Sequence, residues 1–441
     1  MRLASGLDVL RLRDFRLVFA AAAVSFLGDG IQPLALTFAV LDLTGSATDL
    51  GFALGAWTIA LVASLLVGGV VADRFGRRVV MIGADVVRLA SQGAIAALLI
   101  TGRATIAEIV VGQALLGAAT GFFNPASSGL VPRVAGEWLQ QANSLRGMAM
   151  ASGAIAGPAI AGGLVAASSP GVALAIDAGT YAASALLLAR VQRDIPAQPA
   201  GRFLDDLRRG FAEVRSRTWL WCTLVALSIV NAVTVGFMVI GALIVKRHLG
   251  GPGGWALILS LQGVGALVGG SALLRVSPRR PLLVATLIGL VPVLPTFLMA
   301  VPAALALIAA AALLGGVGEM VFNTLWETTL QQHIPDEARS RVSSYDWFGS
   351  LALRTVGYAL IGPFAAAVGD STALYCCGVV ELIAVGSLLL VSDIRTLGPA
   401  PVSLAAPAIE TRAERPHTIT PLTREPIDSR PGTASDADSA V

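Results

Sequence analysis

Three ionisable side chains lie inside long apolar runs of this sequence, far from the charged segments that flank those runs. Asp29 lies in the middle of the first run, and Glu319 and Arg354 occupy similar depths in two later runs. A carboxyl group removed from bulk water can bind and release a proton, as a reversible proton carrier must. We therefore expect proton chemistry at Asp29, with a structural ion pair to Arg354 as the alternative. For Glu319, proton chemistry and such an ion pair are equally open.

A second set of charges forms a pattern in the short connection between the apolar runs 49–72 and 79–101. The connection reads Gly69-Val-Val-Ala-Asp73-Arg74-Phe-Gly76-Arg77-Arg78. Arginine costs about 2.5–3.5 kcal/mol at the centre of a bilayer, so the connection must lie at a water interface. Asp73 can accept charge-assisted hydrogen bonds from arginines and from backbone N–H groups at a helix start. We expect Gly69 and Gly76 to let helices and loop approach closely.

Asp85 and Arg88 follow this connection, three positions apart in the same apolar run. That spacing places both side chains on one face of a helix. They either extend the charge network of the connection or neutralise each other near the interface, and the sequence leaves both interpretations open.

The composition is that of a chain built to lie in lipid. Charged residues make up 13% of the chain and hydrophobic residues 55%, and the mean hydropathy is +0.76. Soluble proteins carry about 25% charged residues. The 31 basic residues nearly balance the 28 acidic ones, so the net charge gives no reason to expect a nucleic-acid partner. The three cysteines indicate neither a disulfide framework nor a metal site.

Twelve apolar runs are long enough to cross a bilayer as helices. They span 16–41, 49–72, 79–101, 105–126, 139–166, 171–191, 218–245, 254–275, 281–300, 303–327, 343–367 and 371–393. Most lysines and arginines lie in the N-terminal segment and in the connections after every second run. The opposite connections carry only Arg103, Lys246 and Arg247. By the positive-inside rule, we expect a multi-pass protein of the cell (inner) membrane with both termini in the cytoplasm.

The sequence also contains an internal repeat. The segment Gly68–Arg78 is echoed by Gly269–Arg280, and Val131–Pro158 is echoed by Ile334–Pro363. This predicts two six-helix halves of parallel orientation with a substrate site between them. The predicted parts are an N-terminal half at 1–191, an amphipathic cytoplasmic linker at 192–217, a C-terminal half at 218–393 and a disordered tail at 394–441.

The pattern G-x-x-x-D-R-x-G-R-R in the first of these loops resembles a signature of the major facilitator superfamily of secondary transporters, in which it joins helices 2 and 3. The resemblance implies an all-α membrane fold with twelve transmembrane helices and transport by alternating access. It also implies a gate in which Asp73, Arg74, Arg77 and Arg78 latch one half to the other in the outward-open state, with helix 11 as the contact.

The fifth run contains Gly153-Ala-Ile-Ala-Gly157-Pro158-Ala-Ile-Ala-Gly162-Gly163. This segment resembles the G-x-x-x-G-P-x-x-G-G element associated with antiporters of the superfamily, with one extra residue before the final glycine pair. Small residues at this spacing equally predict a seam for close helix packing. Gly265 and Gly269 of the apolar run 254–275 offer a partner for it.

Further stretches, such as Gly-Phe-Phe-Asn-Pro-Ala in helix 4, are similar to the bacterial branch that includes macrolide-type drug efflux pumps and siderophore exporters. On the helices that line the cavity in such proteins, we expect a wall that contains Gln32, Asn124, Asn231, Gln262, Asn323 and Trp326. A wall of polar and aromatic groups suits an amphiphilic organic molecule. Asp177 and Glu381 lie on helices expected at the periphery, where structural roles are favoured.

Together these features predict a secondary active transporter that exports amphiphilic or hydrophobic, drug-like small molecules in exchange for protons. A siderophore or metabolite exporter on the same fold is the first alternative, and a non-transporting membrane sensor is the second. A neighbouring group of drug–proton antiporters carries an arginine early in helix 4, which this sequence lacks. We expect a monomer in the lipid bilayer, with no cofactor, no metal and no enzymatic activity, because no nucleophile–base set or nucleotide loop occurs.

Overall fold

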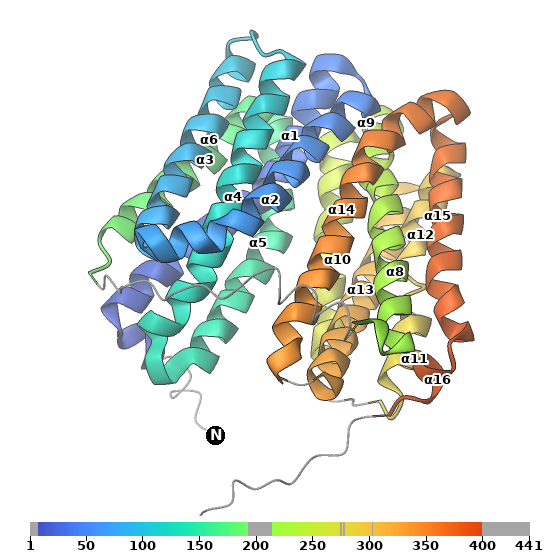
Figure 1. Ribbon diagram of the computed structural model, residues 1–441. Helices are drawn as coiled ribbons and strands as arrows, with labels where there is room; N and C mark the ends of the chain where they lie inside the picture. The colour runs from blue at the N-terminus through green and yellow to red at the C-terminus, as the bar shows by residue number, and fades with distance from the viewer. Residues whose placement is uncertain are drawn as a thin grey trace, which may run out of the picture. The chain divides into compact units, whose positions relative to one another are not determined.

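The structure is a computed structural model that describes residues 8–192, 214–273, 276, 278–301, 303–334 and 336–398. In this part of the chain every regular element is helical (Figure 1). The long helices of the first part are α1 (Arg13–Thr44), α2 (Ala47–Phe75), α3 (Arg77–Ile100), α4 (Ile106–Ala135), α5 (Leu139–Ala167) and α6 (Pro170–Ala189). The second part contains α8 (Thr218–Val233), α9 (Ala242–His248), α10 (Gly251–Leu273), α11 (Pro281–Ile288), α12 (Val293–Ala300), α13 (Leu305–His333), α14 (Asp336–Val368), α15 (Asp370–Ser387) and α16 (Ser392–Thr396).

Each predicted apolar run corresponds to one helix or to consecutive helical pieces. The run 218–245 forms α8, a π-helical turn at Phe237–Gly241 and α9, whereas 281–300 forms α11 and α12. Ten stretches of the described residues are long and apolar enough to cross a membrane, and one of them, Ile106–Ala167, contains both α4 and α5. Helix α14 contributes the shorter apolar stretch Ala352–Val368. The predicted all-α membrane architecture is therefore confirmed.

Local signals set several helix starts. The Thr105 side chain accepts a hydrogen bond from the Glu108 backbone N–H while the Glu108 carboxylate accepts one from the Thr105 backbone N–H, which forms a capping box for α4. Ser46 caps α2 and Ser169 caps α6. These caps satisfy N–H groups that have no partner within the helix, so they define the ends of the membrane helices.

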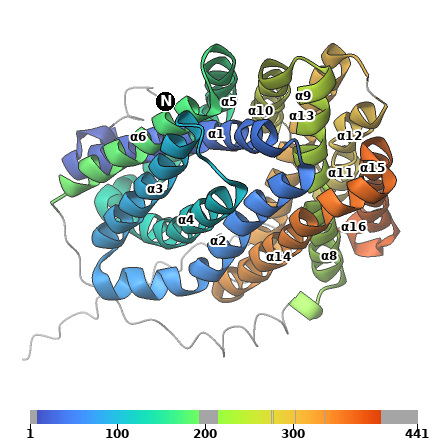
Figure 2. The same ribbon diagram turned by 90° about the horizontal axis from the view of Figure 1, so that it is seen from above.

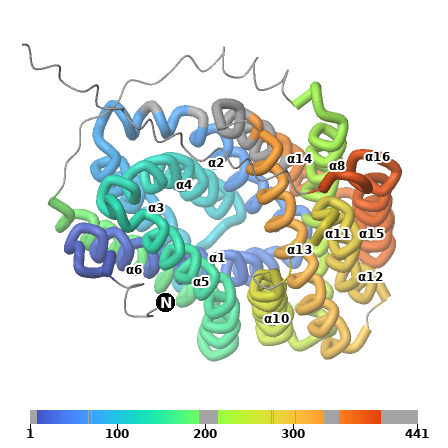
Figure 3. Tube along the Cα trace, turned by 90° about the horizontal axis from the view of Figure 1, so that it is seen from below, coloured from blue at the N-terminus to red at the C-terminus, as the bar shows by residue number. Residues whose placement is uncertain are grey.

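The helices form two groups. In the first, α1 packs against α5 and α6, α2 against α4, and α3 against α4 and α6. In the second, α10 packs against α13, α8 against α14, and α12 against α15. Figures 2 and 3 show α1–α6 gathered on one side and α8–α16 on the other. This is the arrangement of two six-helix halves that the internal repeat predicts.

Among the described residues, the two halves share an apolar core at one end. One cluster of buried side chains contains residues of both halves, among them Phe38, Leu50, Ile240 and Tyr358. Two further clusters of buried side chains lie within one half each. The members of the first are drawn from between Val9 and Val191, and those of the second from between Val214 and Ile394. Helices α2 and α14, and α5 and α10, carry the contacts between the halves. In Figure 1 the two groups meet at the top and spread apart at their lower ends.

Two of the predicted parts lie mostly outside the described residues. The predicted linker falls largely within 193–213 and the predicted tail within 399–441, and these residues lie outside the described part of the chain. At the start of the predicted tail, Ser392–Thr396 forms α16, and Ile394 is only 1% exposed. Ile394, the first residue of the predicted tail, packs in the apolar core of the second half.

Candidate transport site

Asp29 lies at the middle of α1 and is held by a hydrogen bond on one side. The residue is exposed, and its carboxylate oxygen Oδ1 accepts a hydrogen bond of 3.0 Å from the hydroxyl of Tyr181 on α6. Tyr181 is only 1% exposed. The preceding residue, Gly28, contacts Thr180 and Asp177 so closely that a Cβ atom there would overlap them. Close packing of α1 on α6 thus holds one face of Asp29 while the other remains open.

A buried polar network lies behind Asp29, between α3 and α6. Arg88 Nη1 lies 3.5 Å from Asp85 Oδ1, and the hydroxyl of Ser184 donates to Asp85 Oδ2 at 2.6 Å. Gln92 Nε2 donates to Asp177 Oδ2 at 2.8 Å. These side chains are at most 2% exposed. Such a network is costly in an apolar surrounding unless its members pair, so it constrains the packing of α3 against α6.

The guanidinium of Arg88 also lies against two aromatic rings. Its Cζ atom is 4.4 Å from the centre of the Phe123 ring and 5.2 Å from that of Tyr181. Cation–π contacts of this kind stabilise a desolvated cation by about 2 kcal/mol. Of the two interpretations left open for Asp85 and Arg88, the structure supports mutual neutralisation. The two side chains form a buried pair within the polar network between α3 and α6. It lies away from the connection between α2 and α3, whose charges make other contacts.

Glu319 and Arg354 do not form the pair considered from the sequence. Glu319 is exposed on α13, where its Oε2 atom accepts a hydrogen bond of 3.2 Å from Gln262 of α10. The Arg354 guanidinium lies 5.8 Å from the ring centre of Tyr358 on its own helix. Among the described contacts, Asp29 pairs with Tyr181, so the structure gives no support to an ion pair between Asp29 and Arg354.

The predicted wall residues differ in how far they are buried. Asn124 and Asn323 are exposed, and Gln32, Asn231 and Gln262 are half-buried. Gln32 donates from Nε2 to Oε1 of the buried Gln113 at 2.9 Å, and Asn231 bonds the backbone of its own helix. Trp326 is only 2% exposed, and its ring packs edge-on against Trp219 at 5.9 Å between centres. Trp326 is thus a core residue of the second half in this structure.

The glycine-rich segment of α5 is a packing seam that serves two neighbours. Gly153 and Gly157 contact the backbone of α1 at Phe26 and Gly30, with no space for a Cβ atom. Gly162 contacts Ala256 of α10 in the other half, and Pro158 is buried within the helix. The packing interpretation is therefore confirmed, with α1 rather than the glycines of α10 as the main partner.

The loop motif between α2 and α3 makes its described contacts within the first half. Arg77 forms an ion pair of 2.9 Å with Asp73, and its guanidinium lies against Gly129 of α4. Arg78 donates to the carbonyl oxygens of Leu188 and Ala189 at the end of α6, where Leu188 O also accepts from the backbone N–H of Val191. Arg74 is exposed beside the ring of Phe75.

The two glycines of the motif differ. Gly76 has φ of +90°, a conformation that other residues rarely adopt, so a glycine is required at this turn. Gly69 has no atom within 4 Å of the position that its Cβ would occupy. The expectation of a close approach at Gly69 is therefore wrong for this structure. The neighbouring Gly68 instead packs against the α4 backbone at Gly121, because α2 turns that side toward α4.

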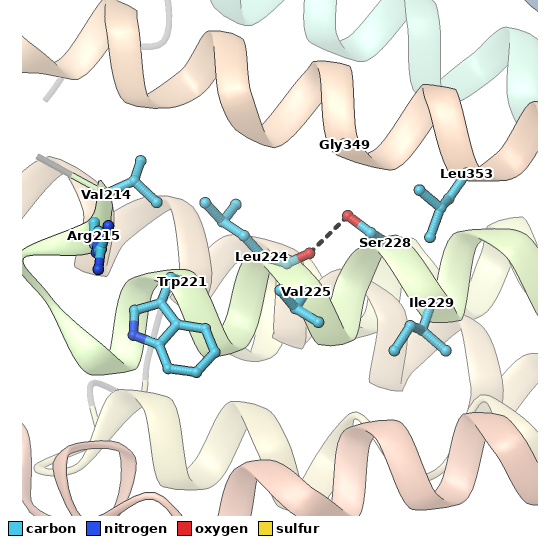
Figure 4. A pocket seen from close by; sticks show the side chains of 9 residues that line it. All are labelled: Val214, Arg215, Trp221, Leu224, Val225, Ser228, Ile229, Gly349 and Leu353. Atoms are coloured by element: carbon cyan, nitrogen blue, oxygen red, sulfur yellow. Dashed lines mark hydrogen bonds between the residues drawn. The ribbon is translucent and has the colours of Figure 1, made fainter. Parts of the chain in front are cut away.

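A cavity of about 660 Å³ lies within the second half, between α8 and α14. Figure 4 shows Arg215 and Val214 at one end, and Ser228, Ile229 and Leu353 at the other. Its lining is mainly aliphatic, and none of the predicted site residues belongs to it. It is separate from the polar groups around Asp29.

The sequence model of the Major Facilitator Superfamily matches residues 18–352. The chain belongs to the Major Facilitator Superfamily. It is 28% identical over 373 residues to the Multidrug efflux pump Tap of Mycolicibacterium fortuitum, which covers 80% of this chain and 89% of that protein. The pump of the same name from Mycobacterium tuberculosis (strain ATCC 25618 / H37Rv) is 28% identical over 371 residues, covering 80% and 87%.

Solved transporters share the fold at low sequence identity. A peptide transporter of the POT family in complex with sulfate superimposes with a TM-score of 0.70 at 14% identity, covering 88% of this chain and 96% of that one. The nucleoside transporter NupG gives 0.69 at 12% identity, covering 85% and 99%. These likenesses show the fold. Membership of the superfamily and the relatives named above make this chain a multi-pass transporter of the cell membrane.

Within this superfamily fold, the sequence did not reveal the partners of the site residues. Tyr181, Gln92 and Gln113 were missed because a lone tyrosine or glutamine in an apolar run is a weak signal. The expected peripheral position of its helix predicts a structural role for Asp177, but its Oδ1 atom lies against Gly28 of α1, the residue before Asp29. A spacing signal did exist, since Asp177, Tyr181 and Ser184 recur on one face of α6.

Proposed function

We propose that this transporter exports amphiphilic or hydrophobic organic molecules in exchange for protons. Two relatives that are 28% identical over most of the chain are named multidrug efflux pumps, which supports export as the direction and drug-like compounds as the class. The exposed amides Asn124 and Asn323, together with the exposed carboxylate Glu319, offer a few polar groups among apolar helices. Binding sites for drug-sized molecules have that composition.

The observation that carries the proton assignment is the environment of Asp29. Its carboxylate is exposed on one side and fixed by the Tyr181 hydroxyl on the other. A carrier must exchange its proton with water and must also respond to the conformation of the protein. Asp29 meets both requirements, because movement of α1 against α6 would change its only described hydrogen bond.

We place the loop motif on the cytoplasmic side, in line with the distribution of arginines. The end where the halves share a core then faces outward, and the spread ends face the cytoplasm. Lys246 of α9 forms an ion pair of 2.6 Å with Asp42 of α1, which bridges the halves at the outward end. The arrangement corresponds to an inward-open state of an alternating-access cycle, in which a substrate enters from the cytoplasm.

In this state, the gate role proposed for Asp73 is latent. The Asp73 carboxylate accepts from Arg77 within its own half, and Arg78 holds the end of α6. When the halves close on the cytoplasmic side, the exposed Arg74 and the Asp73–Arg77 pair would face α14 across the interface. The motif would then stabilise the outward-open state by charge-assisted hydrogen bonds.

Transport into inside-out membrane vesicles tests this proposal. Vesicles with the full chain should accumulate the fluorescent amphiphile ethidium only while their interior is kept acid, because protons leaving the vesicle drive the dye inward. Collapse of the pH gradient with nigericin should release the dye. Uptake of a labelled siderophore but of no drug-like compound would favour the alternative exporter, and uptake of nothing in a broad panel would contradict transport.

A further inference from the structure

Among the described residues, the buried network of the first half contains one carboxyl group, Asp177, for which no ion pair is formed. Asp85 is paired with Arg88 at 3.5 Å and accepts from Ser184. Asp177, which is 0% exposed, has Gln92 as its hydrogen-bond donor at 2.8 Å. The second oxygen of Asp177, Oδ1, is buried without a hydrogen-bond partner. An ionised carboxylate in that situation costs several kcal/mol, so the group is expected to bind a proton.

Asp177 is also close to Asp29. Its Oδ1 atom lies directly against the backbone of Gly28, the residue before Asp29. Tyr181, which donates to Asp29, is one helical turn after Asp177 on α6, so both side chains leave the same face of that helix. A negative charge on Asp29 therefore disfavours a negative charge on Asp177, and the reverse holds equally.

We propose that Asp177 is a second proton-binding site, buried behind Asp29, and that the two carboxyl groups titrate as a coupled pair positioned by Tyr181. The inference rests on the proposed proton coupling and extends it to a residue with no exposure. The pair holds one negative charge when a single proton is bound and none when two are bound. Asp29 is the member that meets water, whereas Asp177 retains its proton when α1 and α6 are closely packed.

The groups that surround Asp177 support this assignment. From α3, Gln92 donates to it; the neighbouring Tyr181 donates to Asp29 of α1, and the Tyr181 ring lies against Arg88 of α3, which pairs with Asp85. From α5, the nearest ionisable side chain is Arg146, whose guanidinium lies 5.8 Å from the ring of Phe26 on α1. Because Asp85 takes up the charge of Arg88, the remaining carboxyl groups outnumber the cations of the network.

Infrared titration of the purified full chain in lipid tests the inference without any substrate. Protonated carboxyl groups give a carbonyl band that ionised ones lack. The wild type should retain such a band at neutral pH, and Asp177→Asn should remove one titrating component. In Asp29→Asn, the pH midpoint of the Asp177 component should shift, because the neighbouring charge is gone. Glu381→Gln removes another buried carboxyl group, in the second half, and should leave these midpoints unchanged.

If Asp177→Asn does not fold, the variant Gln92→Leu tests the proposed site instead, because Gln92 donates to Asp177. Loss of the amide donor should move the carbonyl band of Asp177 to higher frequency. An Asp177 that stays ionised has no such band, so it would show no shift. Tyr181→Phe retains the ring against Arg88 but removes the donor to Asp29, so the pH midpoint of the Asp29 component should shift. An unchanged band in both Asp177→Asn and Gln92→Leu overturns the inference, as does a band that disappears on addition of sodium ions.

The outcomes of this titration and of the transport assay are separable. Gradient-driven ethidium transport with no contribution of Asp177 to the band would leave the proposed function standing and remove the second site. A coupled pair without gradient-driven transport would retain the buried site and remove proton-driven export.

Discussion

At the scale of single residues, the sequence identified the costly charges but not their partners. Asp29 stands out as a lone carboxylate in an apolar run, which composition alone reveals. Its hydrogen-bond donor, Tyr181, is 152 positions away, and no periodicity within one helix links the two. The same limit explains why Arg354 was considered as its partner. Side-chain pairs between helices depend on which faces meet, and that is decided by packing of the whole half.

Asp29→Asn should leave the amount of folded protein in the membrane near the wild-type level, because Asn still accepts a hydrogen bond from Tyr181 and no cation is stranded. The double variant Asp29→Asn with Arg354→Leu should behave as Arg354→Leu alone does. Quantitative immunoblots of membranes check both. A poorly folded Asp29→Asn that recovers in the double variant would establish the ion pair that the structure does not contain, since a stranded buried charge costs about 3–5 kcal/mol.

Gly129 of α4 offers a test of the loop motif that leaves every charge in place. An alanine there would put its Cβ atom where the Arg77 guanidinium now lies. Because that guanidinium is the end of a flexible side chain, Gly129→Ala should fold normally but break the Asp73–Arg77 pair. We expect ethidium transport to fall several-fold. The control Gly83→Ala has no atom near its new Cβ and should transport normally. Equal transport by both variants would argue against a role for the pair.

At the scale of helices, apolar runs and caps predicted where the elements lie, whereas the breaks within them were not predicted. The run 281–300 appears continuous in sequence but divides into α11 and α12 around Pro292, which has no N–H group for a helical hydrogen bond. The π-helical turn at Phe237–Gly241 has no comparable signal. Hydrophobicity specifies that a segment is buried in lipid or protein, and it does not specify the path of the backbone.

The seam between α1 and α5 predicts a strong difference between two neighbouring positions. At Gly157 a side chain would meet the backbone of Gly30, which cannot move aside, whereas Gly163 has free space around it. Gly157→Val should therefore destabilise the protein by at least about 1–3 kcal/mol. Gly163→Val should be tolerated. Thermal unfolding of the two purified variants checks this, and similar melting temperatures would contradict the packing assigned to α5.

At the scale of the whole molecule, the internal repeat and the loop motif were sufficient to predict the superfamily fold. The repeat determines two parallel halves, and the motif identifies the family that uses them. The relative arrangement of the halves was not predictable, because the same apolar pattern serves each state of an alternating-access cycle. What the structure adds is the shared core at one end and the Lys246–Asp42 bridge across it.

The orientation follows from the arginine distribution and can be tested by labelling. In a background in which Cys222, Cys376 and Cys377 are replaced by serine, a cysteine at Ser168 should react with an impermeant maleimide added to intact cells. A cysteine at Glu137, in the turn between α4 and α5, should react only after the membrane is opened. The reverse pattern would invert the topology and, with it, the inward-open assignment.

The central claim is that movement of substrate one way moves protons the other way through Asp29. Liposomes that contain the purified full chain, a trapped pH indicator and no initial pH gradient measure this directly when ethidium is added outside. With the wild type, entry of the dye should expel protons and make the interior alkaline. With Asp29→Asn, the dye should bind without any change of internal pH. An interior that stays neutral while the wild type carries ethidium, or one that turns equally alkaline with Asp29→Asn, would contradict the account.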